Sequence, residues 1–270
     1  SWPGQCIVIR ETILSTEAQQ AYQAVAPAYD VLTGGYAHER WLAGLEALAF
    51  EHGLVGHRLL DVACGTGASF LPMLTRRYAV TGCDISTAML ARARLKAPQA
   101  RLHLADMRRL PILGEFDLVT CLDDALNYVL DEEELEATLC GFARNLAPGG
   151  IAIWDLNTLA QYRGQFARDQ VIARDDVFIG WSAGSASSET HPGDLVEIRI
   201  DVFAPTVGEN WHRSSSVHRQ RHWPRSRVEA LTHVAGLELV DIRGQHPGGV
   251  IGDQLDELAH TKAIYVACAR

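Results

Sequence analysis

The chain has 270 residues, of which 47% are apolar and 21% charged, ordinary proportions for a globular protein with a substantial core. Its formal net charge of −9 argues against a protein whose main task is to coat nucleic acid or an anionic membrane. No segment approaches the roughly 18 apolar residues of a membrane span, and residues 1–10 lack the apolar stretch of a secretory signal. The length accommodates one large domain, or one domain that carries an insertion.

Six cysteines are scattered along the chain without any Cys-x-x-Cys pair: Cys6, Cys64, Cys83, Cys121, Cys140 and Cys268. Several of them lie within apolar runs, as small buried hydrophobic side chains do. This distribution predicts reduced thiols in a cytoplasmic protein rather than a disulfide framework or a zinc site.

The segment 59–67, Leu-Leu-Asp-Val-Ala-Cys-Gly-Thr-Gly, carries the strongest signal in the chain. An apolar run that ends in an acid predicts a buried strand, and residues 68–76 have helical character. Gly65 and Gly67 would let a ligand lie against backbone N–H groups at a helix N-terminus. The dinucleotide fingerprint of oxidoreductases needs a third glycine where Phe70 stands, so a pyrophosphate site is disfavoured. A strand–turn–helix without any ligand is the alternative.

From about residue 58 the chain alternates short apolar runs with helical patterns. Strands are expected at 58–62, 79–83, 101–104, 116–121 and 151–155, and helices at 68–76, 86–97 and 131–147. A further helix and two final strands are expected at 226–235, 237–242 and 263–269. Such alternation implies right-handed crossovers and a parallel sheet with helices on both faces.

Residues 156–224 break this alternation, because they lack long helical periodicity. Candidate strands lie at 177–183, 195–203 and 211–223. In the middle one, apolar residues at the even positions from 196 to 202 alternate with charged ones, the pattern of a half-solvated antiparallel strand. We therefore expect an inserted antiparallel sheet over the ligand-binding edge of the parallel sheet.

Polar residues lie at the expected strand ends, where ligands of parallel sheets bind: Asp61, Asp84, Asp106, Asp123, Asp124, Asp155 and Asn157. Asp84 follows Gly65 by 19 residues, and a carboxylate there can accept hydrogen bonds from both hydroxyls of a ribose. Asp106 can accept from an adenine amino group while Met107 covers the ring. The alternative is that these acids only solvate strand ends.

The run at 59–67 resembles the first motif of class I methyltransferases that use S-adenosyl-L-methionine (SAM), of the form hydrophobic-Asp-hydrophobic-x-Cys-Gly-Thr-Gly. This resemblance implies SAM as the cofactor. Asp84 then matches the ribose-binding acid, and Asp106 with Met107 the adenine-binding pair. Further cofactor-binding positions expected near them are Ala63, Gly65, Gly67, Ile85 and Leu122.

Residues 23–41 look like the N-terminal cover of small-molecule methyltransferases, such as glycine N-methyltransferases and the N,N-dimethyltransferases of antibiotic amino sugars. The resemblance implies that aromatic side chains of this segment close over the cofactor and bind its methionine carboxylate. Tyr29, Tyr36 and Trp41 are the matching positions. The alternative is an aromatic stripe that packs N-terminal helices onto the sheet.

With this resemblance, the chain is predicted to have an α/β fold with a Rossmann-like, doubly wound, mostly parallel seven-stranded sheet. Residues 56–155 and 225–270 would form the SAM-binding domain. Residues 1–55 would form the helical N-terminal cover, and residues 156–224 the inserted antiparallel sheet, which would act as a substrate lid.

The segment Leu122-Asp123-Asp124-Ala125 follows the fourth strand, where many methyltransferases place residues beside the transferred methyl group. The Asn/Asp-Pro-Pro-Tyr/Phe motif of enzymes that methylate planar exocyclic amines is absent, which disfavours an adenine or glutamine amide substrate. Asp124, Asn127 or Tyr128 could face the substrate instead, and helix capping is the alternative role.

The insertion ends with His-Arg-Gln-Arg-His-Trp-Pro at 218–224. Strand alternation places His218, Gln220 and His222 on one face, and the two histidines about 13 Å apart are too distant to share a metal ion. His222 is a candidate general base because the pKa of histidine lies near neutrality, and a surface hydrogen-bonding row is the alternative. The nearby basic residues, which could contact an anionic substrate group or simply offset the acidic chain, are Arg219, Arg221, Arg225 and Arg227.

Together these patterns predict an enzyme that transfers a methyl group from SAM to a nitrogen, or an oxygen, of a small molecule, with secondary metabolism suggested by resemblance. The expected chemistry is an in-line displacement that depends mainly on positioning. We expect a small-molecule partner, no nucleic acid, membrane or metal, and a monomer or homodimer. An NAD-dependent oxidoreductase and a non-catalytic SAM-binding module are the alternatives. The expected catalytic residues are Tyr29, Asp124, Tyr128 and His222.

Overall fold

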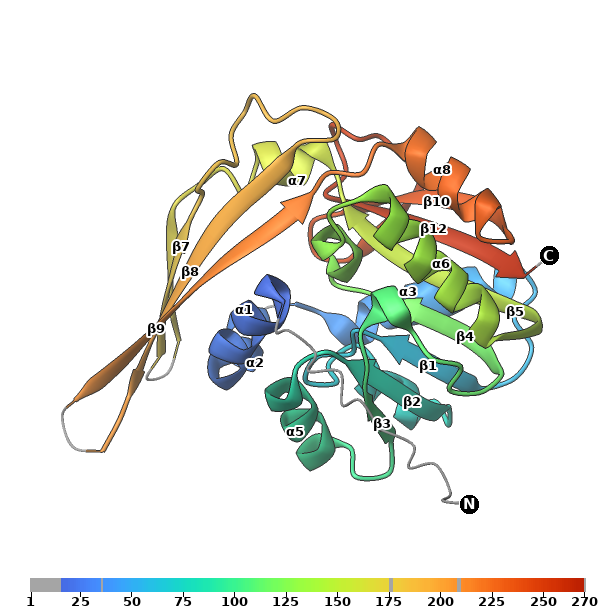
Figure 1. Ribbon diagram of the computed structural model, residues 1–270, viewed down its shortest axis with the longest axis horizontal. Helices are drawn as coiled ribbons and strands as arrows, with labels where there is room; N and C mark the ends of the chain where they lie inside the picture. The colour runs from blue at the N-terminus through green and yellow to red at the C-terminus, as the bar shows by residue number, and fades with distance from the viewer. Residues whose placement is uncertain (1–15, 35, 175–176, 208–209, 270) are drawn as a thin grey trace, which may run out of the picture.

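The computed structural model describes residues 16–34, 36–174, 177–207 and 210–269. Cys6 and the first 15 residues of the expected cover lie outside the described residues. Two sheets make up the framework, a mainly parallel sheet of eight strands and an antiparallel sheet of four, which arches away from it on the side of the N-terminal helices (Figure 1). None of the helices in the described part is long and apolar enough to cross a membrane.

The large sheet has the strand order β11-β10-β12-β5-β4-β1-β2-β3. The parallel strands are β1 (Arg58–Val62), β2 (Ala79–Asp84), β3 (Arg101–Leu104), β4 (Phe116–Cys121) and β5 (Leu146–Asn157). Strand β12 (Lys262–Ala269) runs antiparallel between β5 and β10 (Leu237–His246). The predicted α/β fold with a mostly parallel sheet of seven core strands is confirmed.

An eighth strand, β11 (Val250–Gln254), was not expected and pairs antiparallel with β10. Its signal in the sequence was the pair Gly248 and Gly249, which both have positive φ angles at the turn between the two strands. The pair is a strong hairpin signal that periodicity alone does not detect.

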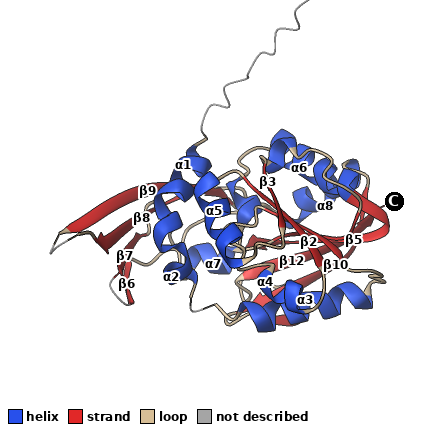
Figure 2. Ribbon diagram, turned by 90° about the horizontal axis from the view of Figure 1, so that it is seen from below, coloured by secondary structure: helices blue, strands red, loops and turns tan. Residues whose placement is uncertain are grey.

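Helices cover both faces of the large sheet (Figure 2). Helices α3 (His38–Glu51), α4 (Leu71–Thr75) and α5 (Thr87–Lys96) share one apolar core with the sheet. Helices α6 (Glu132–Asn145) and α8 (Arg225–Val234) share the other. The first turn of α6 is acidic, and Asp131 caps the helix by accepting a hydrogen bond from the Glu134 backbone N–H.

The insertion is a small antiparallel sheet of β6 (Gln170–Arg174), β7 (Val177–Ser182), β8 (Leu195–Pro205) and β9 (Trp211–Arg221), preceded by the short helix α7 (Leu159–Arg163). Three of these strands match the expected ones, and β6 is additional. The alternating apolar residues of β8 are buried on one face, as their period of two requires. Helix α1 (Glu17–Val25), followed by η1 (Ala26–Ala28) and α2 (Tyr29–Thr33), lies between this sheet and the large one (Figure 1).

The helix expected at 68–76 is shorter than predicted, because α4 begins only at Leu71. Gly67 has a φ of +89°, and a Cβ atom there would lie 2.7 Å from Cζ of Phe70, whose ring is fully buried. The turn at 68–70 therefore packs the Phe70 ring beneath the glycine loop instead of continuing a helix. The residue that breaks the dinucleotide fingerprint is thus a structural support for this loop.

We predict that Gly67→Ala destabilises the protein by more than the left-handed backbone alone explains. An alanine at a positive φ costs about 1–2 kcal/mol, and the Phe70 contact adds to that cost. Gly53→Ala is the matched control, since Gly53 has a φ of +91° with no atom within 4 Å of the added Cβ. Urea unfolding measures both variants, and equal losses of unfolding free energy would contradict the proposed packing against Phe70.

Candidate active site

Three adjoining hollows lie where the parallel strands end beneath the N-terminal helices, and Tyr128 lines all of them. The inner cavity, about 70 Å³, lies against the glycine loop that follows β1. The side groove, about 320 Å³, adjoins the inner cavity and is lined in part by the residues that follow β3. The outer cavity, about 390 Å³, lies under the inserted sheet. Of the polar residues expected at the strand ends, five line these hollows and two, Asp61 and Asp155, do not; the five are Asp84, Asp106, Asp123, Asp124 and Asn157.

The glycine loop is open because three of its residues have positive φ angles: Ala63, Gly65 and Gly67. Asp84 at the end of β2 holds this loop, since one carboxylate oxygen accepts the Gly65 N–H at 2.9 Å and the other accepts the Ser86 N–H at 2.7 Å. Burial raises the pKa of Asp84 although these N–H groups oppose the shift. A carboxylate has about four lone-pair sites, so Asp84 retains capacity to accept from a ligand in the inner cavity.

The N-terminal helices are fastened over the inner cavity by polar contacts from successive turns. In α1, the Gln23 side-chain oxygen accepts hydrogen bonds from the Ser86 hydroxyl at 2.6 Å and from the Ala88 N–H at 2.9 Å. In α2, Asp30 accepts hydrogen bonds from the Thr66 hydroxyl and from the Lys96 ammonium, both at 2.6 Å. These helices therefore bind directly to the glycine loop and to the turn after β2.

Tyr29 lines both the inner and the outer cavity, and its Cε1 atom lies 3.8 Å from the position of a Cβ on Gly65. Tyr36 lines the outer cavity only, where its hydroxyl accepts a hydrogen bond from Gln245 at 2.6 Å. Trp41 is fully buried and packs edge-on against Tyr36. Of the three aromatic positions, the structure thus brings Tyr29 to the inner cavity, Tyr36 to the outer one and Trp41 to neither.

Most of the other expected cofactor positions lie around the inner cavity and the side groove, whereas Gly67 lines none of the three hollows. Ala63, Gly65, Asp84, Ile85, Met107 and Leu122 line the inner cavity, and Asp106 lines the side groove. Asp106 accepts hydrogen bonds from the Arg108 guanidinium, with the shortest at 2.6 Å. Burial would raise the pKa of Asp106, but Arg108 lowers it below its ordinary value, so this carboxylate is ionised and already has a partner.

Asp123 and Asp124 follow β4 in consecutive left-handed conformations, with φ angles of +59° and +56°. Left-handed backbone is costly for residues other than glycine and is typical of functional sites. His38 lies 3.1 Å from one oxygen of Asp123. Burial would raise the pKa of Asp123, but the contact with His38 and the charge of Lys262 lower it.

Asp124 lies at the boundary between the outer cavity and the large sheet. Its backbone N–H donates to Asp155 at 3.0 Å, and its Oδ2 atom accepts from the amides of Asn157 at 2.8 Å and Gln220 at 2.9 Å. Its Oδ1 atom accepts no hydrogen bond from the described residues, and the side chain lines the outer cavity. Burial raises the pKa of Asp124 despite the nearby Lys262.

Lys262, the first residue of β12, is a buried cation that sequence reasoning missed. Its ammonium group forms a close ion pair with Asp155, and it lines the outer cavity. Burial alone would lower the pKa of Lys262, but the carboxylates of Asp155, Asp124 and Asp123 raise it. A lone lysine that begins an apolar strand was the signal for this residue.

The predicted face of β9 is buried, so a surface hydrogen-bonding row is the wrong interpretation of it. His218 lines the outer cavity and lies 2.8 Å from the Tyr128 hydroxyl. His222 instead lies 3.2 Å from Glu257 and lines none of the three hollows. The geometry therefore favours His218 over His222. The four nearby arginines bind separate carboxylates or carbonyl groups and form no common anion site in the described structure.

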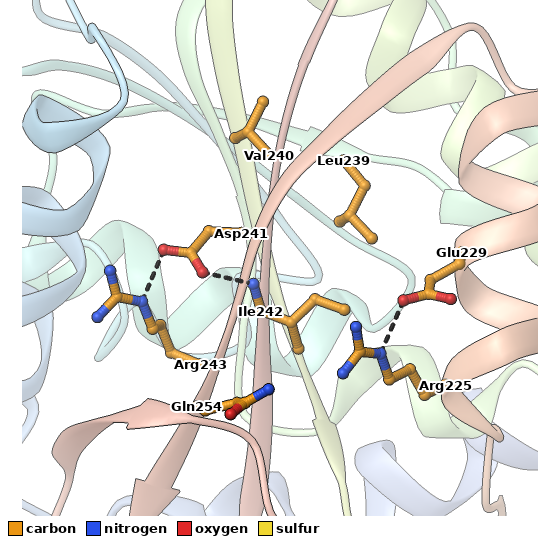
Figure 3. A pocket seen from close by; sticks show the side chains of 8 residues that line it. All are labelled: Arg225, Glu229, Leu239, Val240, Asp241, Ile242, Arg243 and Gln254. Carbon is orange, nitrogen blue, oxygen red and sulfur yellow. Dashed lines mark hydrogen bonds and ion pairs between the residues drawn. The ribbon is translucent and has the colours of Figure 1, made fainter.

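Another groove of about 480 Å³ lies between α8 and β10 and shares no lining residue with the three hollows (Figure 3). Its charged groups pair among themselves, Arg225 with Glu229 at 2.7 Å and Arg243 with Asp241 at 2.6 Å. Among its described lining residues, none has a positive φ angle and none has a buried acceptor without a hydrogen-bond partner. Size alone does not make it the active site. Among the described residues, no group of three or more potential metal ligands is placed to hold a metal ion.

Comparisons with known proteins agree with this geometry. Residues 59–150 match a family described as a methyltransferase domain. The chain is 30% identical over 232 residues to the dTDP-3-amino-3,6-dideoxy-alpha-D-glucopyranose N,N-dimethyltransferase of Streptomyces fradiae, an alignment that covers 84% of this chain and 88% of that protein. The putative methyltransferase YqeM of Bacillus subtilis is 30% identical over 223 residues, covering 81% and 87%.

The chain belongs to the class I SAM-dependent methyltransferases. The fold agrees, because the structure of a SAM-dependent methyltransferase from Clostridium acetobutylicum superimposes with a TM-score of 0.76 at 24% identity, over 92% of this chain and 98% of that one. The predicted family, enzyme class and cofactor are thereby confirmed, and an NAD-dependent oxidoreductase is set aside. The open glycine loop and the buried acceptor Asp84 suit the nucleoside of SAM, and the adjoining hollows give it room.

We predict that Asp84→Asn weakens SAM binding by about tenfold or more, the scale of a charge-assisted hydrogen bond. The asparagine also turns an N–H₂ group toward one of the two backbone donors that Asp84 now accepts from. Calorimetric titration with SAM measures the change. Asp117→Asn is the control, because Asp117 pairs with Arg58 on the same sheet but away from the three hollows. Unchanged affinity in a folded Asp84→Asn variant would remove this residue from the cofactor site.

We predict that Lys262→Met destabilises the methyltransferase by about 3–5 kcal/mol, because it leaves a buried carboxylate unpaired. Burial raises the pKa of Asp155 to about 6 although Lys262 opposes this shift, so removal of the ammonium group raises the pKa further. A carboxyl group with a raised folded-state pKa loses stability as pH increases, so the defect should be larger at pH 8 than at pH 5.5. Urea unfolding at both pH values measures it, and Lys262→Met with Asp155→Asn should recover most of the loss. A defect independent of pH would contradict the charge pairing.

Proposed function

We propose that this methyltransferase transfers the methyl group of SAM to the nitrogen of a small-molecule amine bound in the outer cavity. The observation that carries the proposal is the charge at the boundary between the inner and outer cavities. Three carboxylates, Asp123, Asp124 and Asp155, face one buried ammonium group, Lys262. Such a net negative field attracts a cationic amine and opposes the ionisation of a phenol or alcohol, so nitrogen is favoured over oxygen.

The outer cavity suits a small organic molecule. Aromatic and aliphatic side chains supply much of its wall, with the amides of four glutamines among them; the lining includes Tyr22, Tyr29, Phe166, Trp181, Ile198, Ile200, Gln161, Gln165, Gln170 and Gln220. Many of these lining residues belong to the inserted sheet and to α1. Among the described residues that line this cavity, the lysines and arginines are Arg174 and Lys262, which do not make the basic stripe that a nucleic acid requires.

When bound, SAM supplies a methyl group on a positively charged sulfur, and the new N–C bond forms as the C–S bond breaks with its electrons staying on sulfur. The chain's own residues hold the acceptor nitrogen and exclude water. Positioning of this kind contributes about 7–11 kcal/mol in well-oriented systems, more than the 10²–10⁴-fold of a general base. A cationic amine has no lone pair, so it must lose one proton before its nitrogen forms the new bond. Asp124 can accept that proton, and burial, which raises the pKa of Asp124, makes it a stronger base than a surface aspartate.

The relatives support a nitrogen acceptor. Two proteins with about 30% identity are named as N,N-dimethyltransferases of dTDP-amino sugars, from Streptomyces fradiae and Streptomyces venezuelae. Their named substrates carry the amino group that the charge of this cavity favours. Secondary metabolism, the pathway class suggested by the cover motif, is part of the same proposal.

The test is the formation of S-adenosylhomocysteine across a library of matched amines and phenols. We expect turnover with amines and little with phenols. Turnover confined to phenols would contradict the nitrogen acceptor. SAM binding without turnover of any library member would favour a non-catalytic SAM-binding module.

We predict that Asp124→Asn lowers kcat about 10²-fold on the best amine while SAM affinity changes less than about threefold. Asparagine keeps an oxygen for the Asn157 and Gln220 amides but replaces the acceptor that faces the cavity. Glu238→Gln, at an exposed position of β10, is the control. Steady-state kinetics and calorimetry separate the two effects, and wild-type turnover by Asp124→Asn would exclude Asp124 from the reaction.

A further inference from the structure

Gln220, near the end of β9, connects the inserted sheet to Asp124, which directly precedes the short helix η3 (Ala125–Tyr128). The Gln220 side chain lines the outer cavity and is almost fully buried. Its Nε2 atom donates to Oδ2 of Asp124 at 2.9 Å. Its Oε1 atom accepts from the Tyr162 hydroxyl at 3.0 Å and from the Asn157 amide at 3.1 Å. Four segments that are distant in the sequence therefore meet at one amide.

The geometry fixes which end of each amide donates. An ionised Asp124 has only acceptors, so the Asn157 and Gln220 atoms that contact it are N–H₂ groups. The Asn157 N–H₂ group also contacts the other end of the Gln220 amide, which is therefore the oxygen. The second N–H of Gln220 serves the oxygen of Tyr128. A half-turn of the Gln220 amide would place oxygen against carboxylate and N–H₂ against N–H₂, so the ring of three side chains has one arrangement.

Asn127, a fully buried residue of η3, holds the backbone on both sides of this ring. Its side-chain oxygen accepts the Asn157 N–H at 2.9 Å, and its N–H₂ group donates to the Arg221 carbonyl at 2.8 Å. The backbones that carry Asn157 and Gln220 are thus both anchored beside the turn of Asp124. Supporting hydrogen bonds of this kind keep a reacting group within the narrow range of productive positions.

The two oxygens of Asp124 are consequently not equivalent. Oδ2 accepts two N–H groups, whereas Oδ1 accepts none from the described residues, and the side chain lines the outer cavity. A proton on Oδ2 would displace one of these donors, so Asp124 takes up a proton at Oδ1. Burial raises the pKa of Asp124, and the charge of Lys262 and the two amide donors oppose that shift.

The amides stabilise the ionised Asp124 without adding a charge. Among the described residues, the charged groups that face it are Asp123 beside it, Asp155 from β5 and Lys262 from β12. Four tyrosines from α1, α2, η3 and α7 also lie near it, and burial raises the pKa of each, so they are neutral at neutral pH: Tyr22, Tyr29, Tyr128 and Tyr162. An amide donor favours the carboxylate as an ammonium group does, but it does not repel a cationic amine.

We propose that Gln220 is a positioning residue of this methyltransferase, which holds Oδ2 of Asp124 so that Oδ1 takes the proton of the substrate amine. This inference rests on the proposed N-methylation. The proton moves from the cationic amine to Oδ1, the electron pair of the broken N–H bond stays on nitrogen, and Asp124 becomes a neutral acid. The lone pair is then free to accept the methyl group. The inserted sheet thus supports the proton transfer as well as forming a wall of the cavity.

The protonation of Asp124 can be tested without any substrate, by ¹³C NMR of the full chain labelled at the aspartate carboxyl groups. The signal lost in Asp124→Asn identifies this residue. We expect Asp124 to protonate at a higher pH in Gln220→Met than in the wild type, because a donor to the carboxylate is removed. Gln99→Met, at an exposed turn after α5, is the control and should leave the titration unchanged.

A milder variant covers the case in which Gln220→Met does not fold. Tyr162→Phe removes the hydroxyl that donates to Oε1 of Gln220 and keeps the ring. It should shift the titration of Asp124 in the same direction by a smaller amount. Unchanged titration of Asp124 in the folded variants would overturn the proposal.

The kinetic test is the pH profile of kcat/KM on the best amine of the library. A base must be unprotonated to act, so a raised pKa of Asp124 moves the acid limb of the profile to higher pH. We expect Gln220→Met to lower kcat/KM about tenfold at pH 5.5, the scale of a hydrogen bond to a charged group, and by less as the pH rises. A loss that is equal at every pH would show that Gln220 acts only in packing and would contradict the proposal.

A double variant tests whether Gln220 acts through Asp124. In the Asp124→Asn background, Gln220→Met should change kcat by less than about threefold, because the group that it positions is already gone. Fully additive losses would contradict this role.

The two proposals fail in different ways. If no amine is methylated, the proposed function fails, and the NMR titration still decides whether Gln220 controls the protonation of Asp124. If amines are methylated but Gln220→Met changes neither the titration nor the pH profile, the proposed role of Gln220 fails and the proposed function stands.

Discussion

The structure depends on one electrostatic constraint, the burial of several carboxylates at the rim of the parallel sheet with only one ammonium group among them. Two aspartates with left-handed backbone conformations, Asp123 and Asp124, follow β4, and β5 contributes Asp155 beside them. Lys262 from β12 balances part of this charge. Removing a carboxylate from water is costly unless a partner or a ligand compensates for it. Among the described residues the carboxylates at this rim therefore outnumber the ammonium groups, an arrangement that suits a positively charged ligand such as the sulfonium of SAM.

The backbone of the glycine loop and the N-terminal helices together shape the inner cavity. The positive φ angles of the glycine loop open a surface that side chains would block, and Asp84 pins that loop to the end of β2. Gln23 and Asp30 then attach the N-terminal helices to this loop and to the turn after β2. Helix α1 also contacts β9 of the inserted sheet. Helix α1 thus contributes to the walls of both the inner and the outer cavity.

The sequence was informative where the signal is local. The strand at 58–62, the glycine turn and the acids at positions 84 and 106 follow from short-range patterns, since a buried strand and a tight turn are specified by adjacent residues. The position of Phe70, which argued against a dinucleotide, also has a local cause in the packing beneath Gly67. The residues of the glycine loop that line the inner cavity are predictable from sequence because they are neighbours along the chain.

The boundary between the inner and outer cavities was less predictable from the sequence, because residues from distant segments of the chain form it. Lys262 reaches Asp155 only through the antiparallel register of β12 and β5, and His218 reaches Tyr128 only because the inserted sheet folds back over η3. Trp41 was expected at the cofactor, but an aromatic residue on an amphipathic helix fits equally well in the core, where it lies. His218 and His222 share a face of β9, and only the surrounding helices distinguish the one that lines the outer cavity.

The most direct measurement of the central claim is a crystal structure of the protein with S-adenosylhomocysteine and an amine that it methylates. The account predicts that the nucleoside lies against the Gly65 loop and Asp84, with the sulfur facing the amine nitrogen near Asp124 and Tyr128. A sulfur atom directed away from these two residues, or an amine bound outside the outer cavity, would contradict it.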